Sequence, residues 1–209
     1  MRDAPVDASA TSTGILAVGG SGGSSVIPGD VLSGSASITI ANASNPNQNF
    51  ACPRSSLAMT PSSNPTPPGK ATATITSQTF SSCTANGMFG VTAVSITTNA
   101  SSTCPWTATI DDTTIPAIVT VGGSQSSGCS TAIVWTVDFQ TFFVLQWCIY
   151  SPQGGSVVDT VSIGSALLIL SSASLTKTSG PGTCFANVTF SGGYPLVDQS
   201  QGGVAVDVN

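Results

Sequence analysis

Apolar and polar residues alternate with a period of two along much of the chain. The pattern is clearest in residues 35–41, 71–76 and 91–97, where Val, Ile and Ala are interleaved with Ser and Thr. Successive side chains of a β-strand point to opposite faces, so this period is typical of strands with one buried face. Further strands are expected at residues 106–110, 117–121, 131–139, 142–150, 157–163, 166–170, 184–190 and 203–208.

These segments predict an all-β fold, a disulfide-stabilised β-sandwich or barrel-like fold of about 10–11 short antiparallel strands. Thr and Val favour strands because their branched β-carbons fit a pleated surface. No segment carries a sustained helical stripe, and the helix former Glu does not occur in the sequence. We expect residues 34–209 to form a single β domain. Residues 60–70 hold four prolines and are expected to form an exposed loop, because proline cannot donate in a strand ladder.

Residues 1–33 are rich in Ser, Gly and Ala and contain one short apolar patch. The patch consists of Gly14, Ile15, Leu16, Ala17 and Val18. It has the size of one strand, and the Gly/Ser-rich residues 19–25 after it resemble a flexible linker. Such a strand either is the ordinary first strand of the domain or is donated to a neighbouring subunit by strand addition. Residues 1–20 do not resemble a signal peptide, so an exported protein would have lost its signal.

Residues 131–150 are the most apolar segment and contain six aromatic side chains. We interpret them as two core strands joined near Gln140 and Thr141. The alternative is an exposed aromatic platform that binds sugars or a protein partner. The three tryptophans are the candidate binding residues under that alternative: Trp106, Trp135 and Trp147.

Charge is scarce and mostly negative. Charged residues make up 6% of the chain, and Arg2, Arg54, Lys70 and Lys177 are the four basic ones in a sequence of net charge −5. Such a chain has no basic patch for phosphates, which argues against binding nucleic acid and against attraction to anionic lipid. The longest apolar runs, residues 142–145 and 166–170, are far shorter than the roughly 20 residues of a membrane-spanning helix.

Six cysteines predict three disulfides and an oxidising compartment. They are Cys52, Cys83, Cys104, Cys129, Cys148 and Cys184. No pair forms a Cys-x-x-Cys motif and the chain has no His, which argues against zinc. Sequence alone leaves fifteen pairings open. We favour Cys52 with Cys83, since both flank strands of an expected hairpin, and free buried thiols are the alternative to disulfides.

Motifs of nucleophilic catalysis occur only in unsuitable settings. Residues 19–23 match Gly-x-Ser-x-Gly, but they lie in a glycine linker and the chain has no His to serve as the base. Ser174 and Lys177 match Ser-x-x-Lys, a motif that works on a helix, whereas we expect a strand and a turn here. Side chains three apart on a strand point to opposite faces. We therefore expect no enzymatic activity and no catalytic residues.

The carboxylates are the remaining candidates for chemistry. Asp111 and Asp112, with Asp138 and Asp159, could form a pair for glycoside hydrolysis, but neighbouring Asp residues in a turn rarely point into one cleft. No cofactor and no metal ligands are predicted. Calcium held by Asp and backbone carbonyls is the metal alternative, because hard oxygen ligands suit loop-rich β proteins. Asn42, Asn99 and Asn187 begin N-glycosylation sequons.

Short motifs between residues 50 and 208 resemble a group of largely uncharacterised secreted Ser/Thr/Gly-rich β proteins of actinomycetes. They are Phe80-Ser-Ser-Cys83, Pro105-Trp106-Thr107-Ala108, Gly182-Thr-Cys-Phe-Ala-Asn-Val188 and Gly192-Gly-Tyr194. Cys104, Cys129, Cys148 and the aromatic segment are additions to the usual pattern of that group. The resemblance implies a secreted β protein and no particular mechanism.

The sequence thus favours a non-catalytic structural or assembly protein, secreted or on the cell surface. Few charges, many hydroxylated residues, disulfides and a tethered N-terminal strand suit a subunit of a surface filament, coat or virion that associates with itself. The alternative is a secreted module that binds glycans or another partner through exposed aromatic side chains. Donation of the N-terminal strand would require it to leave its own domain, whereas glycan binding would require exposed, coplanar aromatic rings.

Overall fold

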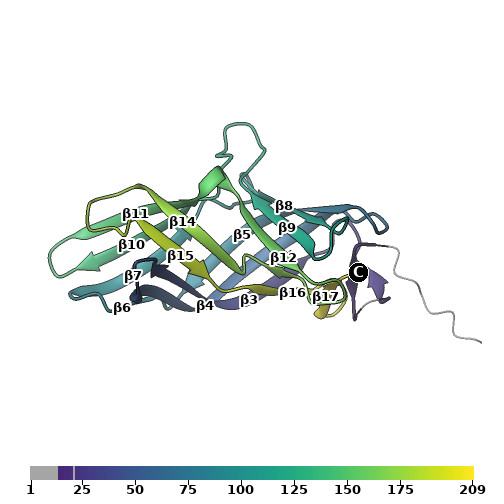
Figure 1. Ribbon diagram of the computed structural model, residues 1–209, viewed down its shortest axis with the longest axis horizontal. Helices are drawn as coiled ribbons and strands as arrows, with labels where there is room; N and C mark the ends of the chain where they lie inside the picture. The colour runs from purple at the N-terminus through teal and green to yellow at the C-terminus, as the bar shows by residue number, and fades with distance from the viewer. Residues whose placement is uncertain (1–13, 21) are drawn as a thin grey trace, which may run out of the picture.

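The protein is an elongated, curled antiparallel sheet (Figure 1). The computed structural model describes residues 14–20 and 22–209, which form seventeen strands and one short 3-10 turn. The elements are β1 (Leu16–Val18), β2 (Ser24–Ser25), β3 (Leu32–Asn42), β4 (Asn45–Ser63), β5 (Lys70–Ser81), β6 (Thr84–Asn86), β7 (Val91–Thr98), β8 (Trp106–Asp111), β9 (Ala117–Gly122), β10 (Trp135–Thr141), β11 (Leu145–Pro152), η1 (Gln153–Gly155), β12 (Val157–Val161), β13 (Leu168–Ile169), β14 (Ser172–Ser179), β15 (Asn187–Ser191), β16 (Tyr194–Asp198) and β17 (Val204–Val208). The all-β prediction is confirmed, and the sheet is a half-barrel.

The sheet branches from the long strands β3, β4 and β5. One arm runs from β5 through β8 and β9 to β12, and the other runs from β3 through β15, β14, β11 and β10 to β7. The first half of β3 instead pairs with β16, which continues through β17 and β1 to β2. Figure 1 shows the consequence: the turn between β10 and β11 lies at one end of the long axis, and the C-terminus lies toward the other.

The longest strand, β4, was not among the predicted strands, and residues 60–63 belong to it instead of to the expected loop. The prolines of β4 are the reason that the sequence did not predict a strand here. Pro53 and Pro61 both lie where the register of β4 with its neighbours shifts. Such bulges are where a strand tolerates a residue that cannot donate a ladder hydrogen bond. The strands β2, β6 and β16 were also missed, since each is short and lies next to glycine. Ser24 and Ser25, expected in a flexible linker, form β2 and pair with β1.

The N-terminal patch is the first strand of its own domain. Leu16, Ala17 and Val18 pair with Val208, Asp207 and Val206 of β17, and Ile15, Leu16 and Ala17 have no exposed surface. Asn64 fastens β1 further, because its side chain accepts from the Leu16 N–H and donates to the Leu16 carbonyl. Residues 14–20 and 22–33 therefore pack against residues 34–209, and β1 and β2 belong to the same sheet as the rest of the domain.

All six cysteines form disulfides: Cys52 with Cys83, Cys104 with Cys129 and Cys148 with Cys184. The predicted pairing of Cys52 with Cys83 is confirmed, and it links β4 to the turn after β5. Cys104–Cys129 ties together the loops before β8 and before β10. Cys148–Cys184 ties the loop between β14 and β15 to β11.

Two of the three tryptophans lie in the core, so the prediction that Trp106 and Trp135 are binding aromatics is wrong. Neither has exposed surface, and their rings meet edge to face with centroids 5.5 Å apart. The Trp135 indole donates to Gln78, whose side-chain amide donates to the Tyr194 hydroxyl. Both rings fall on the inward face of a strand, where a buried indole N–H also finds an acceptor.

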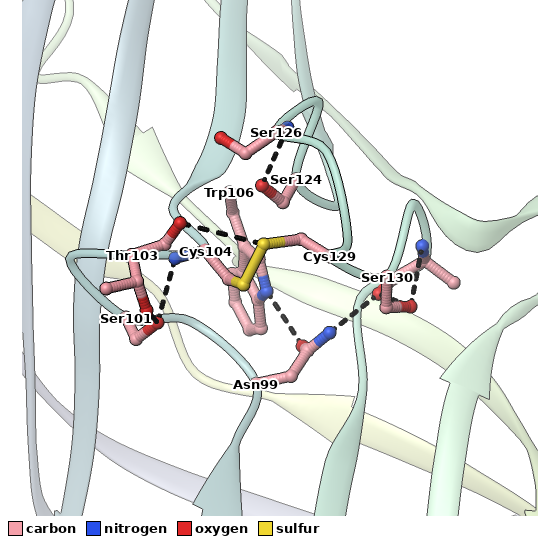
Figure 2. Close-up of a disulfide and its surroundings, with 10 residues drawn as sticks. Asn99, Ser101, Thr103, Cys104, Trp106, Ser124, Ser126, Cys129 and Ser130 are labelled. Atoms are coloured by element: carbon pink, nitrogen blue, oxygen red, sulfur yellow. Dashed lines mark hydrogen bonds between the residues drawn. A yellow bond between two sulfur atoms is a disulfide. The ribbon is translucent and has the colours of Figure 1, made fainter.

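Figure 2 shows how the Cys104–Cys129 region holds Trp106. The Asn99 side chain accepts from the Trp106 indole N–H at 2.8 Å and donates to the Ala132 carbonyl at 3.0 Å. Its oxygen also accepts from the Val134 N–H. Because the Asn99 amide is committed to three hydrogen bonds inside the fold, this sequon is a structural element of the folded protein.

Candidate functional site

An exposed, uncharged cluster of apolar side chains gathers at the tip of the β10–β11 hairpin and on the neighbouring loop between β6 and β7. We call these six residues the hairpin end. They are Phe89 (99% exposed), Phe143 (91%), Leu145 (72%), Phe142 (64%), Val144 (52%) and Trp147 (46%). Contiguous exposed apolar surface is the unusual feature of a folded protein, and it marks a surface that contacts something else.

The hairpin is buried at its base and exposed at its tip. Trp135, Val137 and Phe139 of β10 point into the core, as do Cys148 and Tyr150 of β11. The last ladder pair is Gln140 with Leu145, and the chain turns through residues 141–144 beyond it. The interpretation of residues 131–150 as two core strands is therefore confirmed for the base, whereas the tip is exposed.

The two loops of the hairpin end are joined. The Phe142 N–H donates to the Gly90 carbonyl at 3.1 Å, and Gly90 has the positive φ of +82° that lets the chain turn into β7. The Phe89 and Phe142 rings meet edge to face at 77° with centroids 6.2 Å apart, and Phe142 meets Phe143 at 81°. The exposed phenyl rings thus form one cluster, but they are not coplanar.

The N–H groups of the turn at the tip all find acceptors. The Thr141 N–H and hydroxyl both donate to the Val144 carbonyl at 3.0 Å. The Thr141 hydroxyl oxygen in turn accepts from the N–H of Val144 at 3.1 Å and of Phe143 at 3.4 Å. Together with the bond from Phe142 to Gly90, every N–H of residues 141–144 has an acceptor. The tip therefore presents side-chain carbon outward and few unmet backbone donors.

Charge is remote from the tip. Asp138 is the single charged residue between Asp112 and Asp159 in the sequence, and it pairs with Trp147 across the hairpin. Lys177 lies on the next strand, paired with Tyr150, and its ammonium group donates to the Pro181 carbonyl. Asp138 therefore lies beside Trp147, and the Lys177 ammonium group reaches Pro181, which lines a depression together with Trp147. Charge borders the hairpin end at Trp147, whereas residues 141–145 carry none.

Shallow depressions flank the hairpin. One of about 460 Å³ is lined by Val144, Leu145, Gln146, Trp147 and Pro181, and another of about 370 Å³ includes Met88, Phe89 and Thr183 in its lining. A larger open groove of about 510 Å³ runs along β3, β4 and β5 beside Arg54. Its hydroxyl groups already bond within the protein, as Ser56 does with Thr79 at 2.7 Å, so it offers less for a ligand to satisfy.

Ser174 and Lys177 of the Ser-x-x-Lys match both lie on the strand β14, where a strand and a turn were expected. Three positions apart on a strand, they point to opposite faces. Ser21 of the Gly-x-Ser-x-Gly match lies outside the described residues.

The carboxylates considered for hydrolysis are engaged separately. Asp111 forms an ion pair with Lys70 at 2.8 Å and accepts from Thr113, and the hydrogen bond from Lys70 is the main cause that lowers the pKa of Asp111 to about 2. Asp112 accepts from the Gly69 N–H, and Asp159 accepts from the Ser171 N–H and hydroxyl. Asp138 lies on β10, away from all three.

Buried carboxylates also occur at the other end of the molecule. Asp198 has no exposed surface and accepts from the N–H groups of Ser200 and Gln201. Burial, and then the nearby Asp30 carboxylate, raise the pKa of Asp198 above its usual range. Within residues 14–20 and 22–209 there is no group of three or more His, Cys, Asp or Glu side chains that could hold a metal ion.

The signal for the hairpin end was present in the sequence. Residues 142–145 are four successive apolar residues directly after the turn predicted near Gln140 and Thr141, and residues 142–144 lie in the turn of the structure instead of in the predicted strand 142–150. A strand with one buried face buries every second residue, so such a run cannot direct all its side chains into one core. Of the predicted binding aromatics, Trp147 alone lies in this cluster.

Comparisons with known proteins leave the site to be interpreted from its own geometry. No protein-family model, curated protein or solved structure matches this chain. Among the residues that the structure describes, no helix is both long and apolar enough to cross a membrane.

Proposed function

We propose that this chain is a non-catalytic extracellular attachment protein, a rigid β body that holds the hairpin end against a partner surface. The observation that carries the proposal is the cluster of six exposed apolar side chains with no charged residue among them. Three disulfides are compatible with an oxidising environment outside the cell. The disulfide Cys148–Cys184 holds the neighbouring loop against β11 and so stiffens the base of the hairpin.

Assembly by donation of the N-terminal strand has less support than attachment through the hairpin end. Donation would require β1 to leave its pairing with β17 and to expose Ile15 and Leu16, which are fully buried. The hairpin end needs no such rearrangement. A filament, coat or virion subunit stays a prediction, and self-association through the hairpin end is one outcome of the experiment below.

The test compares the wild-type protein with a triple variant, Phe89→Ser/Phe142→Ser/Phe143→Ser, which we call the hairpin-end variant. Ile115→Ser is the matched control, because Ile115 is 88% exposed in the loop between β8 and β9. Three readouts are made on non-reduced protein: light scattering for self-association, retention on arrays of neutral and acidic glycans, and co-sedimentation with phosphatidylcholine vesicles.

We expect the wild type and Ile115→Ser to bind in at least one readout, and the hairpin-end variant to bind at least about tenfold more weakly there, since each phenyl ring removed forfeits apolar burial. Binding that survives in the hairpin-end variant would contradict the proposal. Absence of binding in all three readouts would contradict it as well.

A further inference from the structure

The hairpin end also indicates what kind of surface it contacts. Resting on the proposed function, we infer that the hairpin end inserts shallowly into an electrically neutral lipid bilayer, with Trp147 at the level of the headgroups. Four features of the described residues favour this partner over a glycan or an anionic membrane: the hydrogen bonding of the turn, the depth of the apolar tip, its charge and the arrangement of its rings.

Hydrogen bonding in the turn suits a hydrocarbon environment. Groups that enter the apolar layer of a membrane cannot exchange their hydrogen bonds for water, so they must be satisfied within the protein. The N–H groups of residues 141–144 all have acceptors in the tip or on Gly90. A polar ligand, by contrast, would find few free donors there.

The length of the apolar tip matches the depth of an interfacial insertion. Trp147 follows Val144 by three residue steps of extended chain, a distance of about 10 Å. Interfacial elements bury their apolar side chains about 5–10 Å below the headgroups. Trp147 is half-exposed at that level, where tryptophan is enriched in membrane proteins, and the Asp138 carboxylate beside it would lie among the polar headgroups.

Charge selects a neutral lipid. The six side chains of the hairpin end carry no charge, and the whole chain has a net charge of −5. Lys177, whose ammonium group donates to Pro181 beside Trp147, is a single cation faced by the Asp138 carboxylate next to Trp147, and it does not form a basic patch that would attract phosphatidylserine or phosphatidylglycerol. Burial of phenyl and aliphatic side chains is then the driving force, and it does not depend on the charge of the lipid. Phosphatidylcholine, which is zwitterionic, is the headgroup that we assign.

The ring geometry disfavours a sugar. A pyranose stacks on a flat aromatic face, and an extended glycan needs several such faces in one plane. The three exposed phenyl rings meet at 77° and 81°. They form an irregular, protruding tip instead of a platform, and fluid lipid chains can adapt to that shape.

The experiment uses Trp147 as its own reporter. The chain has three tryptophans, and Trp106 and Trp135 are fully buried, so a spectral change on adding vesicles reports on Trp147. Non-reduced protein is titrated with phosphatidylcholine vesicles, and then with vesicles of brominated phosphatidylcholine, whose bromine atoms quench a tryptophan that lies in the bilayer. Co-sedimentation gives the partition coefficient independently.

We expect a blue shift of Trp147 emission and quenching by the brominated lipid. Phe143→Ser should lower the partition coefficient about tenfold and the hairpin-end variant at least about a hundredfold, while Ile115→Ser leaves it unchanged. Addition of phosphatidylglycerol or a change of salt concentration should not strengthen binding. Circular dichroism and the unfolding midpoint establish that each variant is folded.

Other outcomes overturn the inference and distinguish it from the proposed function. If phosphatidylcholine vesicles do not bind the wild type, or bind the hairpin-end variant equally well, the bilayer is not the partner. Binding that requires phosphatidylglycerol also overturns the assignment. If the hairpin end then governs self-association or retention on glycans, attachment stands with a different partner. If no readout depends on it, both proposals fail.

Discussion

The two ends of the molecule depart in opposite ways from the usual arrangement, in which apolar side chains are buried and charged side chains are exposed. At the hairpin end, large apolar residues such as Phe143 are exposed to water. At the other end, which we call the acidic end, the carboxylates of Asp198 and Asp207 are buried beside the C-terminal strand. The buried carboxylates accept backbone N–H groups, as Asp207 does from Gly20 at 2.9 Å, so the fold itself accounts for them. No contact within the fold explains the exposure of the phenyl rings, which is why we assign the function to the hairpin end.

The largest expected effect tests whether the hairpin is packed at its base and free at its tip. Trp135→Ala removes a fully buried indole that contacts Trp106 and Phe190 and donates to Gln78. The free energy of unfolding should fall by about 3–5 kcal/mol, from the lost burial and the cavity. Urea unfolding of wild type and variant measures it. A loss below about 1 kcal/mol would mean that the base is packed no better than the tip.

Removal of the disulfide behind the hairpin should have the next largest effect. Cys148→Ala/Cys184→Ala opens a link that spans 36 residues of sequence, and the gain in conformational entropy of the unfolded chain should destabilise the fold by about 4 kcal/mol. The measurement is the unfolding midpoint without reductant. The midpoint of wild-type protein with all three disulfides reduced is measured beside it, and any further decrease below the variant reports the contribution of the other two disulfides. An unchanged midpoint would show that this end of the sheet does not need the link.

A smaller effect is expected at the acidic end. Asp198→Ala leaves the N–H groups of Ser200 and Gln201 without their acceptor, which should cost about 1–3 kcal/mol. Asp198→Asn keeps an acceptor oxygen and removes the charge, so it serves as the matched control. Equal stability of the alanine and asparagine variants would mean that these hydrogen bonds contribute little.

The pH dependence of stability provides a second test of the buried carboxylate Asp198. Because the pKa of Asp198 is raised in the folded protein, its contribution to stability is present below the unfolded pKa of about 3.9 and is lost as pH rises through the folded pKa. Asp198→Asn should therefore gain stability relative to wild type at neutral pH and lose that advantage near pH 3. Unfolding midpoints of both proteins across this range provide the measurement. A constant difference would contradict the raised pKa.

The smallest effect is expected at the tip. Phe143→Ser should change the free energy of unfolding by no more than about 0.5 kcal/mol, since a side chain that is 91% exposed loses little burial. The same urea experiment used for Trp135→Ala measures it. A cost comparable with that of Trp135→Ala would show that the phenyl cluster is part of the core, and the proposed attachment surface would then be wrong.

The local pattern of apolar and polar residues determined the fold class of this protein and most of its strands. Alternation of apolar residues with Ser and Thr indicated the all-β fold and most of its strands, because the period of two follows from the geometry of an extended chain. Cys52 and Cys83 flank neighbouring strands, so their pairing could also be inferred locally. The prolines of β4 misled the prediction, since a bulge that accommodates a proline depends on the partner strand and not on the residue alone.

Tertiary structure decided the rest. Alternation tells which residues share a face, but not which face is covered or where the sheet ends. Trp135 and Trp147 lie on the same hairpin, yet one is buried and the other half-exposed. Trp135 pairs with Tyr150 on the inward face, whereas Trp147 pairs with Asp138 on the opposite face, and only the curl of the sheet decides which of the two faces is covered. In the same way β1 became an internal strand only through pairing with β17, which comes from the far end of the chain. No local pattern contains that contact, because it joins segments that meet only when the whole sheet curls.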